Sequence, residues 1–219
     1  MARGALCKQH IFSFMCRRVP SSTLSLQERL NTLYPDLDDT AAAIIAYAKR
    51  NPFGVNKQVV TNAIEWIMGI QNKDGGLGAF DYENNKKFFN KIPFSDMDSM
   101  CDPSTVDATG RILETLALIP KIGTDTESYQ VSASLESRMR ETATRAIKYL
   151  ESGQESFGAW FGRWGVNYIY GTRNVLCGLV YWETNLDGTR NDTVHTLIED
   201  GVRWLVKTQQ SDGGWGELP

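Results

Sequence analysis

The sequence predicts an all-α protein, and three observations support this. Six segments bounded by turn signals are predicted as helices, at about 39–50, 56–70, 105–119, 135–151, 167–184 and 191–208. No stretch of alternating apolar and polar residues competes with these segments, so no strand is expected. A turn motif also recurs at the ends of three of the segments, which indicates a helical repeat.

Composition limits the class of protein. With 219 residues, of which 42% are hydrophobic, the chain is long enough for one sizeable core, and one domain is expected. A net charge of −3 gives no basic surface, so no nucleic acid is expected as a partner. No apolar run reaches the roughly 18 residues that span a bilayer. The cysteines form no C-x-x-C pair, which argues against a zinc knuckle or a disulfide framework and fits a reducing cytosolic setting: Cys7, Cys16, Cys101 and Cys177.

Residues 1–30 differ in composition from the rest of the chain. Basic residues precede the first acid, Glu28, and a Ser-Ser-Thr stretch follows Pro20. The apolar centre of this segment is too short for a secretory signal. An organellar transit segment is one interpretation, and a disordered or non-native tail is the one we favour.

Proline and glycine set the ends of the first helices. The first helix is expected to stop before Pro52, because proline lacks an N–H donor and biases the preceding residue away from the helical region. The second is followed by a Gly-rich loop at 71–80 and an irregular polar segment at 81–104. The third is expected to end before Pro120.

The recurrent motif has an aromatic residue five positions before a Gln, a Gly four positions after it and a large apolar residue six positions after it. The Gly permits a tight turn with positive φ, the Gln amide can bind backbone groups at a helix end, and the aromatic ring can pack over that amide. We therefore predict that each motif joins successive helices. The three copies are Trp66, Gln71, Gly75 and Leu77; Tyr149, Gln154, Gly158 and Trp160; and Trp204, Gln209, Gly213 and Trp215.

Three carboxylates, Asp36, Asp38 and Asp39, fall within four residues at the start of the first helix. Repulsion between like charges favours protonation of one of them, which makes it a poised acid. In a second interpretation, Asp36 or Asp39 caps the helix. A magnesium site would need a diphosphate and more ligands than the motif offers. A calcium loop at Asp96 and Asp98 is disfavoured because Cys101 occupies the position of the turn glycine.

The segment from Asp36 to Ala41 resembles the Asp-x-Asp-Asp-Thr-Ala motif of the squalene-hopene cyclase group of triterpene cyclases. The Gln and Gly-x-Trp repeats resemble the Gln-Trp turns of that family, and residues 161–172 resemble another of its segments. The resemblance covers about 31–219 and leaves 1–30 unmatched. It implies a partial α/α-barrel (α/α toroid) with Gln-Trp-type repeat turns, as a fragment of a longer two-domain enzyme.

The resemblance also implies a function. Members of the family are intramolecular transferases, classed as isomerases, which cyclise squalene or a similar polyprenyl hydrocarbon by protonation in triterpenoid biosynthesis. They need no metal and no organic cofactor. They are cytoplasmic and contact the membrane peripherally. If truncation leaves the cavity open, the chain is inactive, so the sequence is compatible with an active and with an inactive cyclase-type protein.

Asp38 is the proton donor that the resemblance implies, with Asp36 and Asp39 shaping its hydrogen bonds. Asp107 and Arg111 lie four residues apart on the third predicted helix and so share a face. The resemblance makes them partners of the acid cluster, although some members carry a histidine where Arg111 stands. The alternative is a surface ion pair, which contributes little.

Aromatic residues provide the remaining candidates. By resemblance, Phe80 and Trp164 stabilise a carbocation through their ring faces, and Tyr170 helps to reprotonate the acid cluster. The alternative is that these rings only fill the core. His10 and His195 have no evident partners and are expected at the surface.

Two other classes of protein stay open. A non-catalytic helical-repeat module could keep the turns for packing alone. A protein prenyltransferase β-subunit would need a zinc site built from Asp, Cys and His. In every case a partial toroid exposes apolar helix faces, which favours self-association or membrane contact.

Overall fold

The computed structural model describes residues 35–50, 57–86, 101–122, 131–165, 167–185 and 188–216. Within these ranges the backbone forms helices and no strand, with only three isolated bridges between loop residues. The all-α prediction is therefore confirmed. The helices are α2 (Leu37–Arg50), α3 (Lys57–Gly69), α4 (Val106–Ile122), α5 (Ala133–Ser152), α6 (Tyr168–Leu179) and α7 (Asp192–Thr208).

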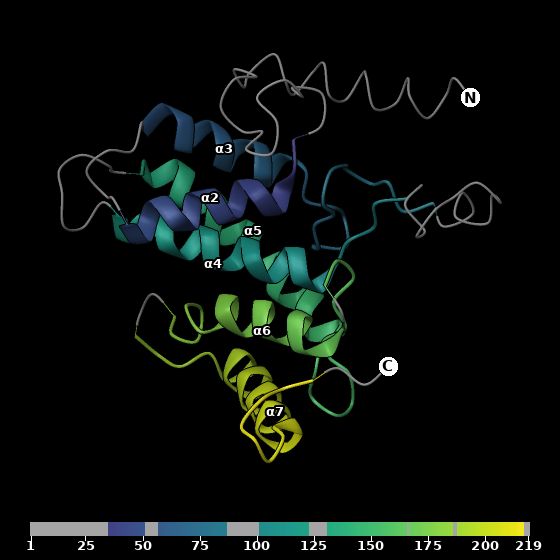
Figure 1. Ribbon diagram of the computed structural model, residues 1–219. Helices are drawn as coiled ribbons and strands as arrows, with labels where there is room; N and C mark the ends of the chain where they lie inside the picture. The colour runs from purple at the N-terminus through teal and green to yellow at the C-terminus, as the bar shows by residue number, and fades with distance from the viewer. Residues whose placement is uncertain are drawn as a thin grey trace.

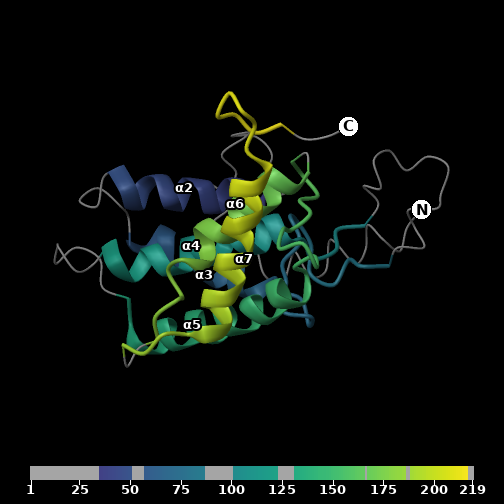
Figure 2. The same cartoon turned by 90° about the horizontal axis from the view of Figure 1, so that it is seen from below.

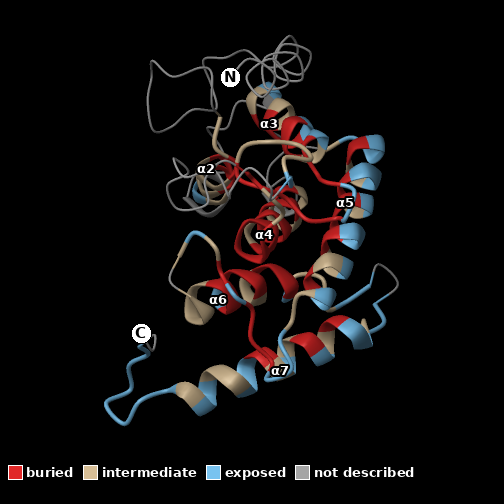
Figure 3. Ribbon diagram, turned by 90° about the vertical axis from the view of Figure 1, so that its right-hand side faces the viewer, coloured by how far each residue is buried: buried red, intermediate tan, exposed pale blue. Residues whose placement is uncertain are grey.

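Helix α4 is the centre of the molecule (Figure 1). It packs against α2, α5 and α6, whereas α7 packs against α6 and against the turn that follows α5. Seen from below, α7 lies over α6 (Figure 2). Colouring by burial shows α4 buried along most of its length, while the C-terminal half of α7 and the turn after it are largely exposed (Figure 3). The large apolar side chains of α4 that are fully buried are Ile112, Leu113, Leu116 and Ile119.

Two glycines bring the backbones of α4 and α6 into contact. A Cβ atom added at Gly178 would lie 2.3 Å from the carbonyl oxygen of Gly110. One added at Gly110 would lie 2.7 Å from the Cα atom of Val175. Both distances are far below van der Waals contact, so no larger residue fits at either position. The close approach packs the N-terminal part of α4 against the C-terminal half of α6.

Replacement of Gly178 with Ala is expected to destabilise the fold by about 1–3 kcal/mol, because the methyl group forces two helix backbones apart. The helix propensity of Ala opposes this loss by at most about 1 kcal/mol. Gly214→Ala is the matched control, since a Cβ there would meet only the flexible Asp212 side chain, at 3.2 Å. Thermal unfolding measures both variants, and an equal Tm for the two would contradict the expectation.

Two predicted helix ends are wrong. Helix α6 stops at Leu179 rather than near 184, because residues 180–182 tighten into a turn in which the Trp182 N–H donates to the Leu179 carbonyl oxygen at 2.8 Å. Helix α4 continues past Pro120 to Ile122. Proline lies in the last turn there, so its missing N–H removes only one hydrogen bond near the helix end.

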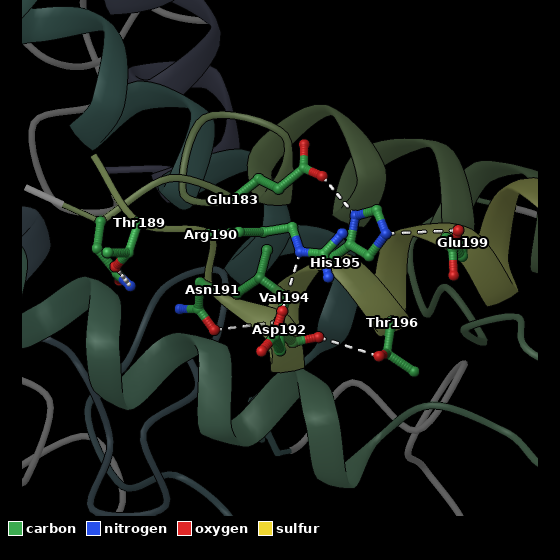
Figure 4. A network of polar contacts seen from close by, with 10 residues as sticks. Glu183, Thr189, Arg190, Asn191, Asp192, Val194, His195, Thr196 and Glu199 are labelled. Atoms are coloured by element: carbon green, nitrogen blue, oxygen red, sulfur yellow. Dashed lines mark hydrogen bonds and ion pairs between the residues drawn. The ribbon is translucent and has the colours of Figure 1, made fainter. Parts of the chain in front are cut away.

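The connection from α6 to α7 is held by polar contacts (Figure 4). The Asn191 side chain caps α7 by accepting the Val194 N–H at 3.3 Å. His195 lies between two carboxylates, with Nδ1 2.6 Å from Glu183 and Nε2 3.4 Å from Glu199. The expectation that His195 has no partner is therefore wrong, because a loop residue distant in the sequence folds back over the first turn of α7.

The three recurrent turns share one hydrogen-bonding pattern. The Gln side-chain amide donates to the carbonyl oxygen of the Gly four residues later, at 2.8 Å for Gln71, 2.9 Å for Gln154 and 2.8 Å for Gln209. Each of these glycines has a positive φ, between 86° and 98°. The conformation suits glycine because other residues rarely adopt it.

Some predictions fall on residues that the structure does not describe. These are the N-terminal segment 1–30 with His10, Cys7 and Cys16, and the weak calcium-loop candidate at Asp96 and Asp98. Among the described residues, no helix has both the length and the apolar character needed to cross a membrane.

Candidate active site

Asp36 caps the helix that carries the acid cluster. Its Oδ1 atom accepts the Asp39 N–H at 3.0 Å, and its carbonyl oxygen accepts the Thr40 hydroxyl at 2.6 Å. The Leu37 N–H donates to the Ala79 carbonyl oxygen at 2.9 Å, which ties the start of α2 to the Gly-rich loop. The capping interpretation is thus confirmed for Asp36. The helix start is held in place by residues other than Asp38.

Asp38 points toward α4, where it meets Arg111. The Oδ1 atom of Asp38 lies 2.5 Å from Nε of Arg111, and the Nη2 atom of Arg111 donates to the Tyr170 hydroxyl at 3.2 Å. The contact between Asp38 and Arg111 is an ion pair. It does not have the angles of a hydrogen bond, because the buried Nε atom of Arg111 has no aligned acceptor. The Asp38 side chain is 36% exposed and that of Arg111 18%. Helices α2, α4 and α6 therefore each supply one member of a polar chain.

Burial is the main cause that raises the pKa of Asp38 above its ordinary value. The positive charge of Arg111 opposes this and lowers the pKa. The negative charges of Asp36, Asp107 and Asp39 raise it further. The pKa of Asp39 is raised as well, first by burial and then by Asp36. The net shift stabilises the protonated form of Asp38 relative to that of a free aspartic acid, and the protonated form is the one that a proton donor needs.

The raised pKa of Asp38 predicts a pH-dependent stability. A folded-state pKa above that of the unfolded chain stabilises the fold at low pH, and this contribution is lost as the pH rises through the folded value. Asn keeps the shape of the neutral acid and carries no charge. The change in Tm caused by Asp38→Asn should therefore be more positive at pH 7 than at about pH 3.5. Asp192→Asn is the control, because that side chain is 81% exposed. Thermal melts over this pH range measure the effect, and a reversed trend would contradict it.

Asp107 is buried and does not form a surface ion pair. It is 1% exposed, and its Oδ2 atom accepts the Trp164 N–H at 2.9 Å. Arg111, four residues along α4, forms its ion pair with Asp38 instead. The surface-pair interpretation is therefore wrong. Asp107 links α4 to the loop before α6, close enough that its charge raises the pKa of Asp38.

Two aromatic rings meet beside these polar groups. The rings of Phe80 and Trp164 lie edge to face, with centroids 6.0 Å apart and planes at 89°. The Arg163 guanidinium lies over the Trp164 ring, 5.5 Å from its centroid. Trp164 is 46% exposed, so it is not simply a core residue. The structure thus connects all the predicted site residues, which are Asp36, Asp38, Asp39, Asp107, Arg111, Tyr170, Phe80 and Trp164.

Asp102 is a structural residue of this site that the sequence analysis missed. Its carboxylate accepts the backbone N–H groups of Ala79, Phe80 and Asp81, at 2.9, 2.5 and 2.7 Å. Asp102 is 4% exposed, and burial raises its pKa while these hydrogen bonds lower it. It fixes the loop that positions both the Phe80 ring and the start of α2. The sequence feature that could have indicated this role is the position of Asp102 directly before Pro103, at the end of a polar loop.

Comparison with known proteins identifies the family. The family model described as the squalene-hopene cyclase C-terminal domain matches residues 15–219. The chain belongs to the squalene-hopene cyclase family.

Among the residues that the structure describes, no group of three His, Cys, Asp or Glu side chains is placed to hold a metal ion.

Three relatives illustrate the similarity to this family. The squalene hopane cyclase afumA of Aspergillus fumigatus is 44% identical over 203 residues, which cover 85% of this chain and 27% of the relative. Enfumafungin synthase efuA of Hormonema carpetanum is 46% identical over 187 residues, covering 85% and 14%. A squalene-hopene cyclase of Bradyrhizobium diazoefficiens is 38% identical over 190 residues, covering 85% and 26%. The chain thus spans between 14% and 27% of the length of these relatives.

Proposed function

We propose that this chain carries the proton-donating site of a polyene cyclase, with Asp38 as the acid that starts cyclisation of squalene or a similar polyprenyl hydrocarbon. One observation carries the proposal. The side chain of Asp38, whose pKa is raised, contacts Arg111, and the Arg111 guanidinium is held by a hydrogen bond to the Tyr170 hydroxyl. We further propose that the helices form part of an α/α toroid with Gln-Trp-type repeat turns. The hydrogen bonds common to the three turns support that architecture.

The reaction needs an unusually strong acid. The proton of the Asp38 carboxyl group passes to one carbon of a terminal alkene, whose π electrons form the new C–H bond and leave a cation on the other carbon. Negative charge then stays on the Asp38 carboxylate. Arg111 lies 2.5 Å from that carboxylate and stabilises the charge, so it favours the product of the proton transfer. Tyr170 holds the guanidinium through its hydroxyl group and acts as a positioning residue.

The growing cation needs stabilisation without a nucleophile that would trap it. Aromatic ring faces provide this because their quadrupole is negative above the ring. Phe80 and Trp164 lie on the two loops that border the acid site and contact each other. Asp107 and Asp102 hold the backbones of these loops and thereby the positions of the rings. No step of this scheme requires a metal or an organic cofactor.

We propose a cytoplasmic protein that contacts a membrane peripherally, since the substrate class is dissolved in lipid. Exposed aromatic side chains near α6 support this proposal. Phe157 is 49% exposed, Phe161 is 52% exposed, and both contact the ring of Tyr168. Large aromatic residues at the surface are typical of interfaces with lipid or protein.

A chimaera tests the proposal, because a relative supplies the rest of the enzyme around the candidate site. Residues 36–216 replace the matching segment of afumA, and the folded chimaera is incubated with squalene before its products are analysed by mass spectrometry. Cyclic products that depend on the inserted segment are expected. A folded chimaera without cyclic product would contradict the proposal. The isolated chain is assayed in parallel, and product from it would show that it is itself an enzyme.

A further inference from the structure

The two aromatic rings of the candidate site lie on loops that are far apart in the sequence. Phe80 belongs to the Gly-rich loop after α3, and Trp164 belongs to the loop before α6. Their ring centroids are 6.0 Å apart, with the ring planes at 89°. An edge-to-face contact depends on both the distance and the orientation of the rings. The two loops therefore have to be held in a fixed relation to each other.

Cys101 and Asp102 form a buried pair that is bonded to the first of these loops. The Asp102 N–H donates to the Asn84 carbonyl oxygen at 2.8 Å. The Asp102 carboxylate in turn accepts the Phe80 N–H at 2.5 Å. The backbone of the Phe80 loop is thus bonded to Asp102 at two points, and its position is defined relative to this pair of residues.

The side chain of Arg163 joins the second loop to the same pair. Its Nη2 atom donates to the Cys101 carbonyl oxygen at 3.2 Å, across 62 residues of sequence. Its Cζ atom lies over the Trp164 ring, 5.5 Å from the ring centroid. One guanidinium therefore contacts the Trp164 ring and, at the same time, the backbone next to the residue that holds the Phe80 loop.

Asp107 holds Trp164 at a different point. The Asp107 carboxylate accepts the Trp164 N–H at 2.9 Å, which fixes the backbone of that residue. A bond to the backbone leaves the χ1 and χ2 rotations of the side chain open. The Arg163 guanidinium restricts these rotations, because a cation is attracted to the face of an aromatic ring and not to its edge. Arg163 thus controls the orientation of the ring, which the Asp107 contact does not.

We infer that Arg163 is a positioning residue for the proposed cyclisation, which sets the Trp164 ring against Phe80 and closes one face of Trp164 to the substrate. The inference rests on the proposed function, in which these two rings stabilise the carbocation. A carbocation over the face that Arg163 covers would be repelled by the positive charge already there. Arg163 therefore selects the side from which the Trp164 ring can act.

The two contacts of Arg163 require a guanidinium. Its N–H groups donate in the plane of the group, while its flat face can lie against an aromatic ring. A lysine ammonium is compact and has neither the planar face nor the forked donors. Arg163→Lys therefore keeps the charge and should lose the simultaneous contact with Trp164 and the Cys101 carbonyl oxygen. The matched control is Arg138→Lys, because Arg138 forms an exposed ion pair with Glu65 at 3.4 Å.

Hydrogen exchange of the isolated chain, measured by mass spectrometry, tests the connection between the loops without a need for activity. The amides of residues 79–81 donate to Asp102, which follows the carbonyl that Arg163 binds. Their exchange should become about three- to tenfold faster in Arg163→Lys, the effect of losing one hydrogen bond. Arg138→Lys should not change it, and circular dichroism confirms that both variants are folded. Equal exchange rates in Arg163→Lys and the unmutated chain would overturn the inference.

Kinetics of the afumA chimaera test the role of Arg163 in the reaction. The rings act on a charge that exists only after the proton has moved, so a misplaced ring lowers kcat and leaves KM unchanged. Arg163→Lys should lower kcat about three- to thirtyfold, the range for a cation stabilised by one aromatic face. Arg138→Lys should leave kcat and KM unchanged. An unchanged kcat in Arg163→Lys, or a rise in KM alone, would overturn the inference.

A double variant shows whether Arg163 acts through the Trp164 ring. In a chimaera that already carries Trp164→Leu, Arg163→Lys should have little further effect on kcat, because the ring that it positions is gone. Effects of the two substitutions that multiply independently would overturn the inference. A folded chimaera that forms no cyclic product would instead contradict the proposed function, whereas hydrogen exchange still decides whether Arg163 connects the two loops.

Discussion

Replacement of Asp38 by Asn is expected to lower product formation by the chimaera at least about 100-fold, the typical contribution of a general acid. The amide has nearly the same shape but cannot supply the proton that starts the reaction. The start of α2 should not change, since Asp36 caps it and Leu37 anchors it to the loop. Cyclic product formed from squalene over time gives the measurement.

Two control variants separate the proton from its surroundings. Asp36→Asn keeps the helix cap, because Asn caps as well as Asp, but removes one charge that raises the pKa of Asp38. It should reduce the rate less than Asp38→Asn does. Asp192→Asn changes an exposed carboxylate on α7 and should leave the rate unchanged. Retention of a tenth or more of the product by Asp38→Asn would exclude Asp38 as the proton donor.

Truncation of Trp160 to Ala is expected to destabilise the fold by about 3–5 kcal/mol, as for other fully buried aromatic residues. The indole is 0% exposed, its N–H donates to the Leu150 carbonyl oxygen at 2.7 Å, and its ring packs against Gly201 of α7. For a domain of this length, the loss corresponds to a fall in Tm of roughly 6–20 °C. Thermal unfolding followed by circular dichroism gives the measurement.

The third turn supplies an internal control for this experiment. Trp215 forms the same hydrogen bond over the same ten-residue separation, at 2.8 Å, but it is 47% exposed. Trp215→Ala should cost less than about 1 kcal/mol in the monomer. Similar losses for the two variants would show that burial does not determine the contribution of Trp160. Trp160→Phe should fall between them, since it keeps most of the ring and loses the N–H donor.

Much of the fold followed from local sequence signals. The six helices, the absence of strands in the described ranges and the capping role of Asp36 all depend on residues close together in the sequence. The two wrong helix ends have local causes, whereas the errors about the site arose from contacts across a large sequence separation. Four-residue spacing placed Asp107 and Arg111 on one helix face, but it did not show which neighbours they meet.

The position of Arg111 depends on the backbone contact between Gly110 and Gly178, which are 68 residues apart. No periodicity in the sequence predicts that contact. Asp102 was missed for a related reason, because its three partners lie more than 20 residues earlier in a loop. The proposed role of Asp38 as an acid therefore follows from the resemblance, whereas its contact with the Arg111 cation is visible only in the structure.

The Gln71 amide also donates to the Thr142 carbonyl oxygen of α5, and the Gln154 amide to the Leu197 carbonyl oxygen of α7, each twelve residues before the next Gln of the repeat. This separation limits how the repeat can change during evolution. The Gln residues lie 83 and 55 residues apart, so the segments between the repeats differ in length. Within each helix that accepts a Gln amide, however, deletion of one residue would rotate the carbonyl by about 100° around the axis, away from the incoming amide. Insertions and deletions should therefore be tolerated in the connecting loops and removed by selection between Thr142 and Gln154.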